Sequence, residues 1–473
     1  MKKPSLLSLI AAFACVALYA QTPDYRFGKV SAEELRMTSY DKDPDAAAVY
    51  LYEENSLFYQ IDREIGLTSD YRARIKILKS DGTDQANVSI PYTDEYSVRE
   101  SVFGIDAVAY NLVDGKIVKT PLKKQYIFTE QVGENHKLVK FSIPEVREGT
   151  VIEYKFRKTS KNPTYIPSFR FQHDIPVARC HMQALIPEFF KFNLNLKGYI
   201  KVNIEDGSTN GSVGSGSDMI SFNVREIKAD ATDIPALKRE AYVWCLNDFR
   251  SMLEFELSQI AFPGIPIRSY TSTWENVNDM LKKSSFDTHC RIGNPFKDEV
   301  AAIKAGEGSP GEKIHAVLRL VQSKMKWNEK YRLFSQGPRT AAGKGTGSSA
   351  DINFVLMAAL KDAGFQVTPI LLSPRHMGRI PYTHPTIDGI NAFVVRVSLD
   401  EGKYAYVDGT NPNSDIDLLP TELLVDRARV YGVNGDNGWC DLTGIAKNAS
   451  VINMILVVSV NTIAGRLSET SLW

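Results

Sequence analysis

The stretch Gly345–Ser373, GTGSSADINFVLMAALKDAGFQVTPILLS, contains the clearest fold signal in the chain. Its middle part, Ala350–Ala363, is long enough for several helical turns and has apolar residues on several sides, as in a buried helix. Gly364 follows and suits the left-handed conformation that ends many helices. Val367–Leu372 then has the composition of a buried strand. The stretch therefore predicts a turn, a buried helix and a strand, in that order.

Two later segments extend this pattern. Ile390–Val395 reads INAFVV, and Tyr406–Thr410 reads YVDGT. They predict further strands near Ala392–Ser398 and Tyr404–Val407, which would share a sheet with the first strand.

Together the three segments resemble the core of the transglutaminase-like, papain-related superfamily. In that superfamily a Gly-x-Cys-x-Asp turn opens the helix, one strand begins His-x-Trp, and another ends Val-Asp-x-Thr. The catalytic Cys, His and Asp of the family fall on Ser349, Asn391 and Asp408 of this chain. Only the aspartate is retained. The resemblance implies an α+β, papain-like domain, and the two replacements put its catalytic activity in doubt.

The two replacements remove the nucleophile and the base of the family's chemistry. In such triads a thiolate attacks an amide carbonyl, and an imidazole transfers the proton. A helix N-terminus favours a thiolate, but it cannot stabilise an alkoxide on Ser349 at neutral pH. Asn391 does not titrate and cannot act as the base. We therefore expect Ser349 to be the N-cap of the helix, and Asp408 to accept hydrogen bonds that tie two strands together.

An active enzyme is the alternative. His384 precedes Asn391 by seven residues, in a loop that also contains His376. A Ser349–His384–Asp408 arrangement would make the protein an amide-processing enzyme, a peptidase or acyl transferase, with Ser349 as nucleophile. The competing interpretation is that these histidines are exposed loop residues. Sequence spacing does not favour the catalytic arrangement.

The first residues indicate export. Lys2 and Lys3 precede the mostly apolar run Leu6–Ala20, and the Ala20–Gln21 bond is a plausible cleavage point. We expect residues 1–20 to be a signal peptide and residues 21–49 an N-terminal extension. Lipid attachment at Cys15 is the alternative, but the apolar run continues past it. The mature protein is expected in the periplasm or associated with the outer membrane, without an integral membrane segment.

Composition narrows the function further. The chain has 56 basic and 56 acidic residues, a balance that offers no electrostatic footprint for nucleic acid. No pattern indicates a cofactor or a metal site. Four cysteines remain after signal removal, which permits disulfides without fixing their pairing: Cys180, Cys245, Cys290 and Cys440.

The region before the helix has a β pattern. Tyr71, Ala73, Ile75 and Ile77 alternate with charged residues, as in a strand with one buried face. Many short alternating runs separated by turns predict an antiparallel β-sandwich over residues 50–228. The region resembles the DUF3857-type domain of exported Bacteroidetes-type proteins, and the matching pieces are Tyr71–Leu78, Tyr110–Lys116 and Gly149–Tyr154.

The remaining boundaries follow from these two regions. Residues 229–272 are expected to be a connector, residues 273–425 the transglutaminase-like domain, and residues 426–473 the start of an incomplete C-terminal β region. The Gly/Ser-rich run Gly207–Ser217 predicts a flexible loop. Trp327 and Tyr331 would line the cleft in the family fold, or else be core aromatics.

The favoured function is thus a non-catalytic, exported binding or scaffold module whose partner is a peptide, a glycan or an envelope protein. A purely structural module with an unused cleft is a further alternative.

Overall fold

The chain forms two compact units, each described here by itself. The computed structural model describes residues 24–62, 64–95, 98–132, 135–214, 219–270, 273–381, 385–387, 389–445, 456–461 and 466–471. The first unit comprises the described residues up to Lys238 together with Ser251–Glu256. The second comprises Arg239–Arg250 and the described residues from Leu257 onward. The expected signal peptide and His384 lie outside the described residues.

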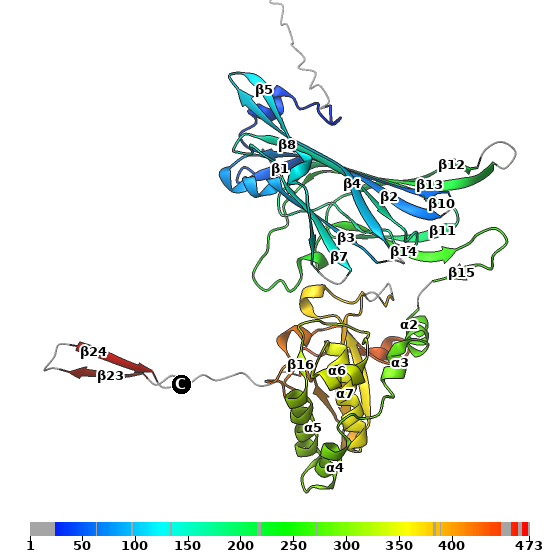
Figure 1. The fold of residues 1–473 in the computed structure, drawn as a ribbon, viewed down its shortest axis with the longest axis vertical. Coiled ribbons are helices and arrows are strands. Elements are labelled where there is room, and N and C mark those ends of the chain that lie inside the picture. Colours follow the sequence, from blue (N-terminus) through cyan, green and yellow to red (C-terminus); the bar gives the residue numbers. More distant parts are fainter. Residues whose placement is uncertain are drawn as a thin grey trace, which may run out of the picture. The chain divides into compact units, whose positions relative to one another are not determined.

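The first unit is built on an eight-stranded sheet with the order β12-β13-β10-β1-β2-β8-β4-β5 (Figure 1). A short helix, α1 (Ala32–Arg36), precedes it. Its strands are β1 (Ala48–Ile61), β2 (Ile65–Ile77), β4 (Glu100–Val113), β5 (Lys116–Pro121), β8 (Val151–Ser160), β10 (Val177–Pro187), β12 (Asn203–Val213) and β13 (Ile220–Ile234).

Two smaller sheets are also present, and β15 of the second one belongs to the second unit. The strands β3 (Asn87–Thr93), β7 (His136–Ser142) and β6 (Phe128–Gln131) form a three-stranded sheet. The strands β9 (Phe169–Arg170), β11 (Phe190–Lys197), β14 (Met252–Ile260) and β15 (Arg268–Ser269) form a four-stranded one. The first part of the chain is therefore rich in strands, as its alternation predicts.

One strand pair departs from the antiparallel expectation. β1 and β10 run parallel, with Tyr50 opposite Val177 and Phe58 opposite Leu185. More than a hundred residues separate the two strands, so a long connection can bring them into the parallel orientation. The prediction of an entirely antiparallel arrangement is wrong at this pair.

The Gly/Ser-rich run also differs from expectation. β12 passes through Gly207–Val213 and pairs with β13 along its whole length. A Cβ on Gly211 would lie 2.6 Å from the Phe222 ring, so a bare backbone is what lets the two strands approach there. The predicted flexible loop is therefore wrong for Gly207–Val213, and Ser215–Ser217 lie outside the described residues.

Buried charges lie on one face of β2. Arg74 forms an ion pair with Glu153 of β8, and both side chains are almost fully buried. Lys76 is fully buried and donates from Nζ to the carbonyl oxygens of Leu35 (2.7 Å) and Gly149 (2.6 Å). This arrangement satisfies charges that would otherwise be costly to bury.

Lys76 makes the stability of the first unit dependent on pH. Burial lowers the pKa of Lys76 to about 8, whereas an unfolded lysine titrates near 10.4. Because the unfolded chain holds the proton more tightly, the contribution of Lys76 to stability rises between about pH 8 and pH 10.4. Lys76→Met removes this dependence. The difference in unfolding free energy, wild type minus variant, should increase from about pH 7.5 to about pH 9.5; a flat difference would contradict the argument.

The second unit contains the predicted helix and sheet. Its five-stranded sheet has the order β20-β19-β18-β21-β22. Its strands are β18 (Val367–Leu372), β19 (Ala392–Ser398), β20 (Tyr404–Val407), β21 (Ala428–Val430) and β22 (Trp439–Cys440). A separate two-stranded parallel sheet consists of β16 (Lys326–Trp327) and β17 (Thr346–Gly347).

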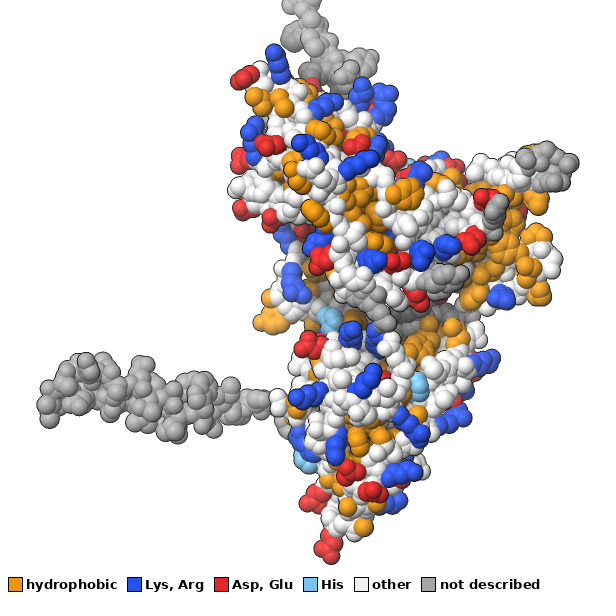
Figure 2. Space-filling view, viewed as in Figure 1, with side chains coloured by type: hydrophobic (Ala, Val, Ile, Leu, Met, Phe, Trp, Pro, Cys, Tyr) orange, Lys and Arg blue, Asp and Glu red, His pale blue; other side chains and the backbone are white. Residues whose placement is uncertain are grey.

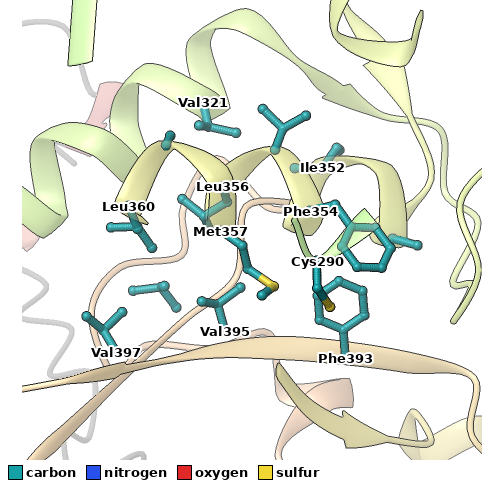
Figure 3. Close-up of a cluster of buried hydrophobic side chains, with 14 of the residues drawn as sticks. Cys290, Val321, Ile352, Phe354, Leu356, Met357, Leu360, Phe393, Val395 and Val397 are labelled. Carbon is teal, nitrogen blue, oxygen red and sulfur yellow. The ribbon is translucent and has the colours of Figure 1, made fainter. Parts of the chain in front are cut away.

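The predicted helix, α7, packs against α4, α5 and α6. The helices of the second unit are α2 (Trp274–Lys282), α3 (Ser285–His289), α4 (Lys297–Ala305), α5 (Pro310–Lys324), α6 (Pro338–Lys344) and α7 (Ser349–Asp362). Ser309 and Glu312 form the capping box at the start of α5. Residues 349–360 of α7 are all buried. Figure 3 shows Leu356, Met357 and Leu360 of this helix between Val321 and the strand residues Phe393, Val395 and Val397.

β23 (Leu456–Asn461) and β24 (Arg466–Ser471) form an antiparallel hairpin inside residues 426–473, where a β region is expected. The four cysteines after the expected signal are free thiols. The permitted disulfides are therefore not formed in this structure. No helix within the described ranges is long and apolar enough to cross a bilayer.

Candidate functional site

The start of α7 is held by a network that leaves Ser349 inside the fold. Ser348 is the N-cap, and its Oγ and N–H both bond to the Asp351 carboxylate in a capping box. Ser335 Oγ also donates to Asp351. Ser349 is the first helical residue, so the prediction that Ser349 is the N-cap is wrong by one position. The spacing Ser-x-x-Asp, which defines the capping box, selects Ser348.

The Ser349 hydroxyl is already fully bonded. Ser349 Oγ accepts the Arg332 N–H at 2.9 Å and donates to the Arg332 carbonyl oxygen at 3.2 Å. The side chain is 1% exposed. A serine nucleophile needs an open path to the substrate and a base within hydrogen-bond reach. Among the residues that the structure describes, no histidine nitrogen or carboxylate oxygen bonds to Ser349 Oγ.

Asn391 has a different partner. It lies directly before β19 and donates from Nδ2 to Ser373 Oγ at 3.2 Å. Its backbone N–H donates to the carbonyl oxygen of Leu372, which extends the pairing of β18 with β19. The observed contacts of Asn391 are therefore those of a residue that joins two strand ends.

Asp408 lies at the end of β20 and is fully buried. Its Oδ1 accepts from Asn353 Nδ2 at 2.8 Å, and its Oδ2 accepts from the Thr410 N–H at 3.1 Å and from Thr410 Oγ1. Burial raises the pKa of this carboxyl, against the opposing effect of the donors. Since Asn353 belongs to α7, Asp408 ties a strand end to the helix. The expected tie between two strands is wrong.

This contact set predicts the effect of Asp408→Ala. The substitution leaves the buried Asn353 and Thr410 donors without their acceptor, and each unsatisfied buried group costs about 1–3 kcal/mol. We expect a loss of about 2–4 kcal/mol from the unfolding free energy. The check is denaturant unfolding followed by tryptophan fluorescence. Asp417→Ala, at an acceptor of one backbone N–H on the same sheet, serves as the comparison, and equal losses would contradict this role of Asp408.

A cavity of about 940 Å³ lies in the second unit, and its lining includes the loop of residues 326–332. Trp327 and Tyr331 lie on its wall with ring centroids 4.8 Å apart. Both are only partly buried and also pack against core clusters. Trp327 and Tyr331 therefore line a cavity and also contact the hydrophobic core.

Charged side chains line the same cavity. Lys326, Lys330 and Arg332 come from the loop, and none of them forms an ion pair with a described residue. His376 lies on the opposite segment, where its Nδ1 is 3.1 Å from Glu422 Oε2. Sequence reasoning missed this charged set. The alternation of basic and aromatic residues in KWNEKYR, residues 326–332, is the signal that could have found it.

Metal ions in proteins are held by groups of His, Cys, Asp and Glu side chains. Within the described ranges, no three His, Cys, Asp or Glu side chains gather closely enough to hold an ion. What the arrangement can do chemically is bind a ligand through cations and aromatic rings. Ser349, Asn391 and Asp408 each bond to other partners, and no hydrogen bond joins any two of them.

The comparisons with known proteins concern both units. Residues 66–231 match the family DUF3857, a domain of unknown function with a solved structure. This confirms the DUF3857 resemblance over well under half of the chain. No curated protein matches this sequence.

Solved structures add information on the fold. The chain is similar to a protein of Parabacteroides distasonis described as a putative protease: identity is 14%, the TM-score is 0.54, and 82% of this chain and 71% of that chain are covered. An M1 zinc metallopeptidase from Deinococcus radiodurans has 7% identity and a TM-score of 0.19, with 40% and 43% covered. Only the first similarity is close enough to indicate a shared fold.

Proposed function

We propose that the protein is an exported binding or scaffold module of the cell envelope, in which a transglutaminase-like domain no longer performs amide chemistry. The observation that carries this proposal is the Ser349 hydroxyl. Its oxygen is buried and bonded in both directions to the backbone of Arg332. A hydroxyl used in this way is not available for attack on a substrate carbonyl.

The arrangement of the second unit supports the transglutaminase-like assignment. Ser349 opens the buried helix α7, Asn391 precedes β19, and Asp408 follows β20, in the order that the family motif requires. The similarity to a protein described as a putative protease is consistent with a peptidase-like or transglutaminase-like fold. The five-stranded sheet includes β21 and β22, so we assign to this domain residues 273–440 rather than the expected 273–425.

For the first unit we propose a β-sandwich. Leu57 and Leu67 of the eight-stranded sheet and Ile90 of the three-stranded sheet line one small cavity of about 200 Å³. Two sheets that share such apolar lining have the relation expected for sandwich layers. Export rests on the sequence of residues 1–20, and we place the mature protein in the periplasm or at the outer membrane.

The mixed surface fits a binding role without a nucleic-acid partner. Lys, Arg, Asp and Glu side chains are interspersed over the face drawn in Figure 2. The proposed partner is a peptide, a glycan or an envelope protein, bound at the cavity of the second unit.

Covalent labelling tests whether Ser349 is reactive. The full chain is incubated with a fluorophosphonate that modifies nucleophilic serines, and the adducts are located by peptide mass mapping. We expect no adduct at Ser349 in the folded protein, and the same labelling in Ser349→Ala. A stoichiometric adduct at Ser349 would overturn the proposal and favour the alternative enzyme, with His384→Ala as the next variant.

A further inference from the structure

The cavity of the second unit carries an excess of unpaired positive charge. Lys326, Lys330 and Arg332 line it and form no ion pair with described residues. On the acidic side, Glu422 pairs with His376, and Glu329 is the remaining lining carboxylate. Elsewhere in this unit some cations have acidic partners, such as Lys324 with Glu299 and Arg319 with Asp415, whereas others, such as Lys283 and Lys297, form no ion pair with a described residue; what distinguishes the cavity is that three cations line it together. The unpaired cations of the cavity therefore attract an anionic ligand.

The backbone of residues 330–332, which carries two of these cations, is held in place by hydrogen bonds. Ser349 N–H donates to the Lys330 carbonyl oxygen at 3.0 Å, and Trp327 Nε1 donates to the same oxygen at 3.2 Å. Ser349 Oγ holds the Arg332 backbone. The position that carries the nucleophile in the resembled family thus acts here as a positioning residue for the cationic loop. A loop that is already ordered loses less entropy when a ligand binds.

The cavity also has an apolar part. Trp327 and Tyr331 form a tilted pair, and Met325, Met377 and Pro412 line the wall near them. Partly buried aromatic rings provide a surface for an apolar side chain of a ligand. The combination of cations and rings selects a ligand that has carboxylates beside apolar groups.

One strand edge favours a peptide over other anions. β16 (Lys326–Trp327) pairs with β17 on one side only, within the part of the chain that the structure describes. Its residues line the cavity. An extended peptide can add to such an edge through main-chain hydrogen bonds, while its side chains enter neighbouring pockets.

We propose that this cavity binds an acidic peptide, an extended segment in which glutamate or aspartate alternates with apolar residues. Lys326, Lys330 and Arg332 contact its carboxylates, and the Trp327–Tyr331 pair contacts an apolar side chain. The proposal rests on the proposed binding function and adds the ligand class and the role of Ser349 as loop anchor.

The test uses a terminally blocked heptapeptide with glutamate at alternate positions and leucine or phenylalanine between them. Its affinity for the full chain is measured by calorimetry, beside the same peptide with glutamine at each glutamate position. The cavity variant is Lys326→Ala/Lys330→Ala/Arg332→Ala. The matched control is Lys283→Ala/Lys297→Ala/Arg339→Ala, which removes equal charge from exposed side chains of the same unit that do not line the cavity.

The expected results distinguish binding of the peptide carboxylates by the cavity cations from non-specific electrostatic attraction to the protein. Exposed ion pairs contribute a few-fold each to an equilibrium constant, so the cavity variant should bind the acidic peptide about tenfold more weakly, and the control less than about twofold. Added salt should weaken wild-type binding. Ser349→Ala should also weaken it, although Ser349 does not line the cavity, whereas Ser348→Ala, which affects the helix cap, should not if the protein remains folded.

Three outcomes would overturn the inference. One is equal affinity for the acidic and the glutamine peptides, the second is equal loss in the cavity and control variants, and the third is tighter binding of an oligouronate or an oligonucleotide than of the acidic peptide. Ammonia or amine release is followed in the same samples. Ammonia or amine release that depends on Ser349 would contradict the proposed non-catalytic function, whatever affinities the peptides have.

Discussion

Glu153→Ala is expected to lower the free energy of unfolding of the first unit by about 3–5 kcal/mol, because it removes the more buried of the two carboxylates that pair with Arg74 and leaves two other donors without their acceptor. Glu153 Oε1 accepts from Arg74 Nε at 2.8 Å and lies 2.7 Å from Nη2 in an ion pair. Its Oε2 accepts from Tyr110 Oη at 2.9 Å and from the Gly28 N–H at 2.8 Å. One carboxylate thus satisfies donors from three separate parts of the chain.

Glu130→Ala provides the matched control for this prediction. Glu130 pairs with Lys140 at 2.8 Å, but both side chains are about half exposed. Exposed pairs contribute about 0–1 kcal/mol. Far-UV circular dichroism in a denaturant series follows both variants. A loss of unfolding free energy in Glu153→Ala no larger than that in Glu130→Ala would contradict the stabilising role of the buried carboxylate.

Phe354→Ala is expected to destabilise the second unit by about 3–5 kcal/mol, the range for removing a large aromatic side chain from a core. The Phe354 ring lies 4.7 Å from Phe393 and 5.2 Å from Phe286, measured between centroids, and it is fully buried. Figure 3 shows Phe354 and Phe393 facing each other between α7 and the sheet. Removal of this ring leaves a cavity in the centre of the cluster.

Phe334→Ala controls for the loss of an aromatic ring as such. Phe334 is 37% exposed, and its centroid is 6.4 Å from Phe286. We expect Phe334→Ala to lower the free energy of unfolding by about 1 kcal/mol, since a side chain that is already partly exposed buries less apolar area. All five tryptophans lie at or after residue 244, so their fluorescence reports the second unit. Equal midpoint shifts for the two variants would contradict the packing argument.

Local patterns predicted the second unit well. The helix expected at Ala350–Ala363 is α7, Ser349–Asp362, and the strand expected at Val367–Leu372 is β18 with the same bounds. Apolar run length and the glycine after the helix are local signals that folding does not change. The one-residue displacement arises because two adjacent serines can each cap, and Asp351 selects Ser348.

The same sequence patterns could not predict which strands pair when they lie far apart in the sequence. The parallel contact of β1 with β10 depends on chain topology rather than on alternation. The strand β12 forms through Gly207–Val213 because β13 supplies its hydrogen bonds, which outweighs the weak strand preference of glycine and serine. Propensity describes a segment alone, whereas pairing depends on its neighbour.

The candidate site was likewise predictable from the sequence only in part. The sequence identified Ser349, Asn391 and Asp408 as the positions of interest, and chemistry indicated that two of them could not act as nucleophile and base. It could not show that Arg332 would take both hydrogen bonds of Ser349, because these two residues meet only through the folded loop. The His376–Glu422 pair could not be predicted either, because its two residues lie far apart in the sequence.

The central claim is that Ser349 anchors a loop and does not perform catalysis. The most direct measurement is amide hydrolysis and acyl transfer by the purified protein, on a broad panel of peptides and glutamine donors, beside Ser349→Ala. We expect no turnover above background in either protein. Turnover by the wild type that is lost in Ser349→Ala would contradict this role of Ser349.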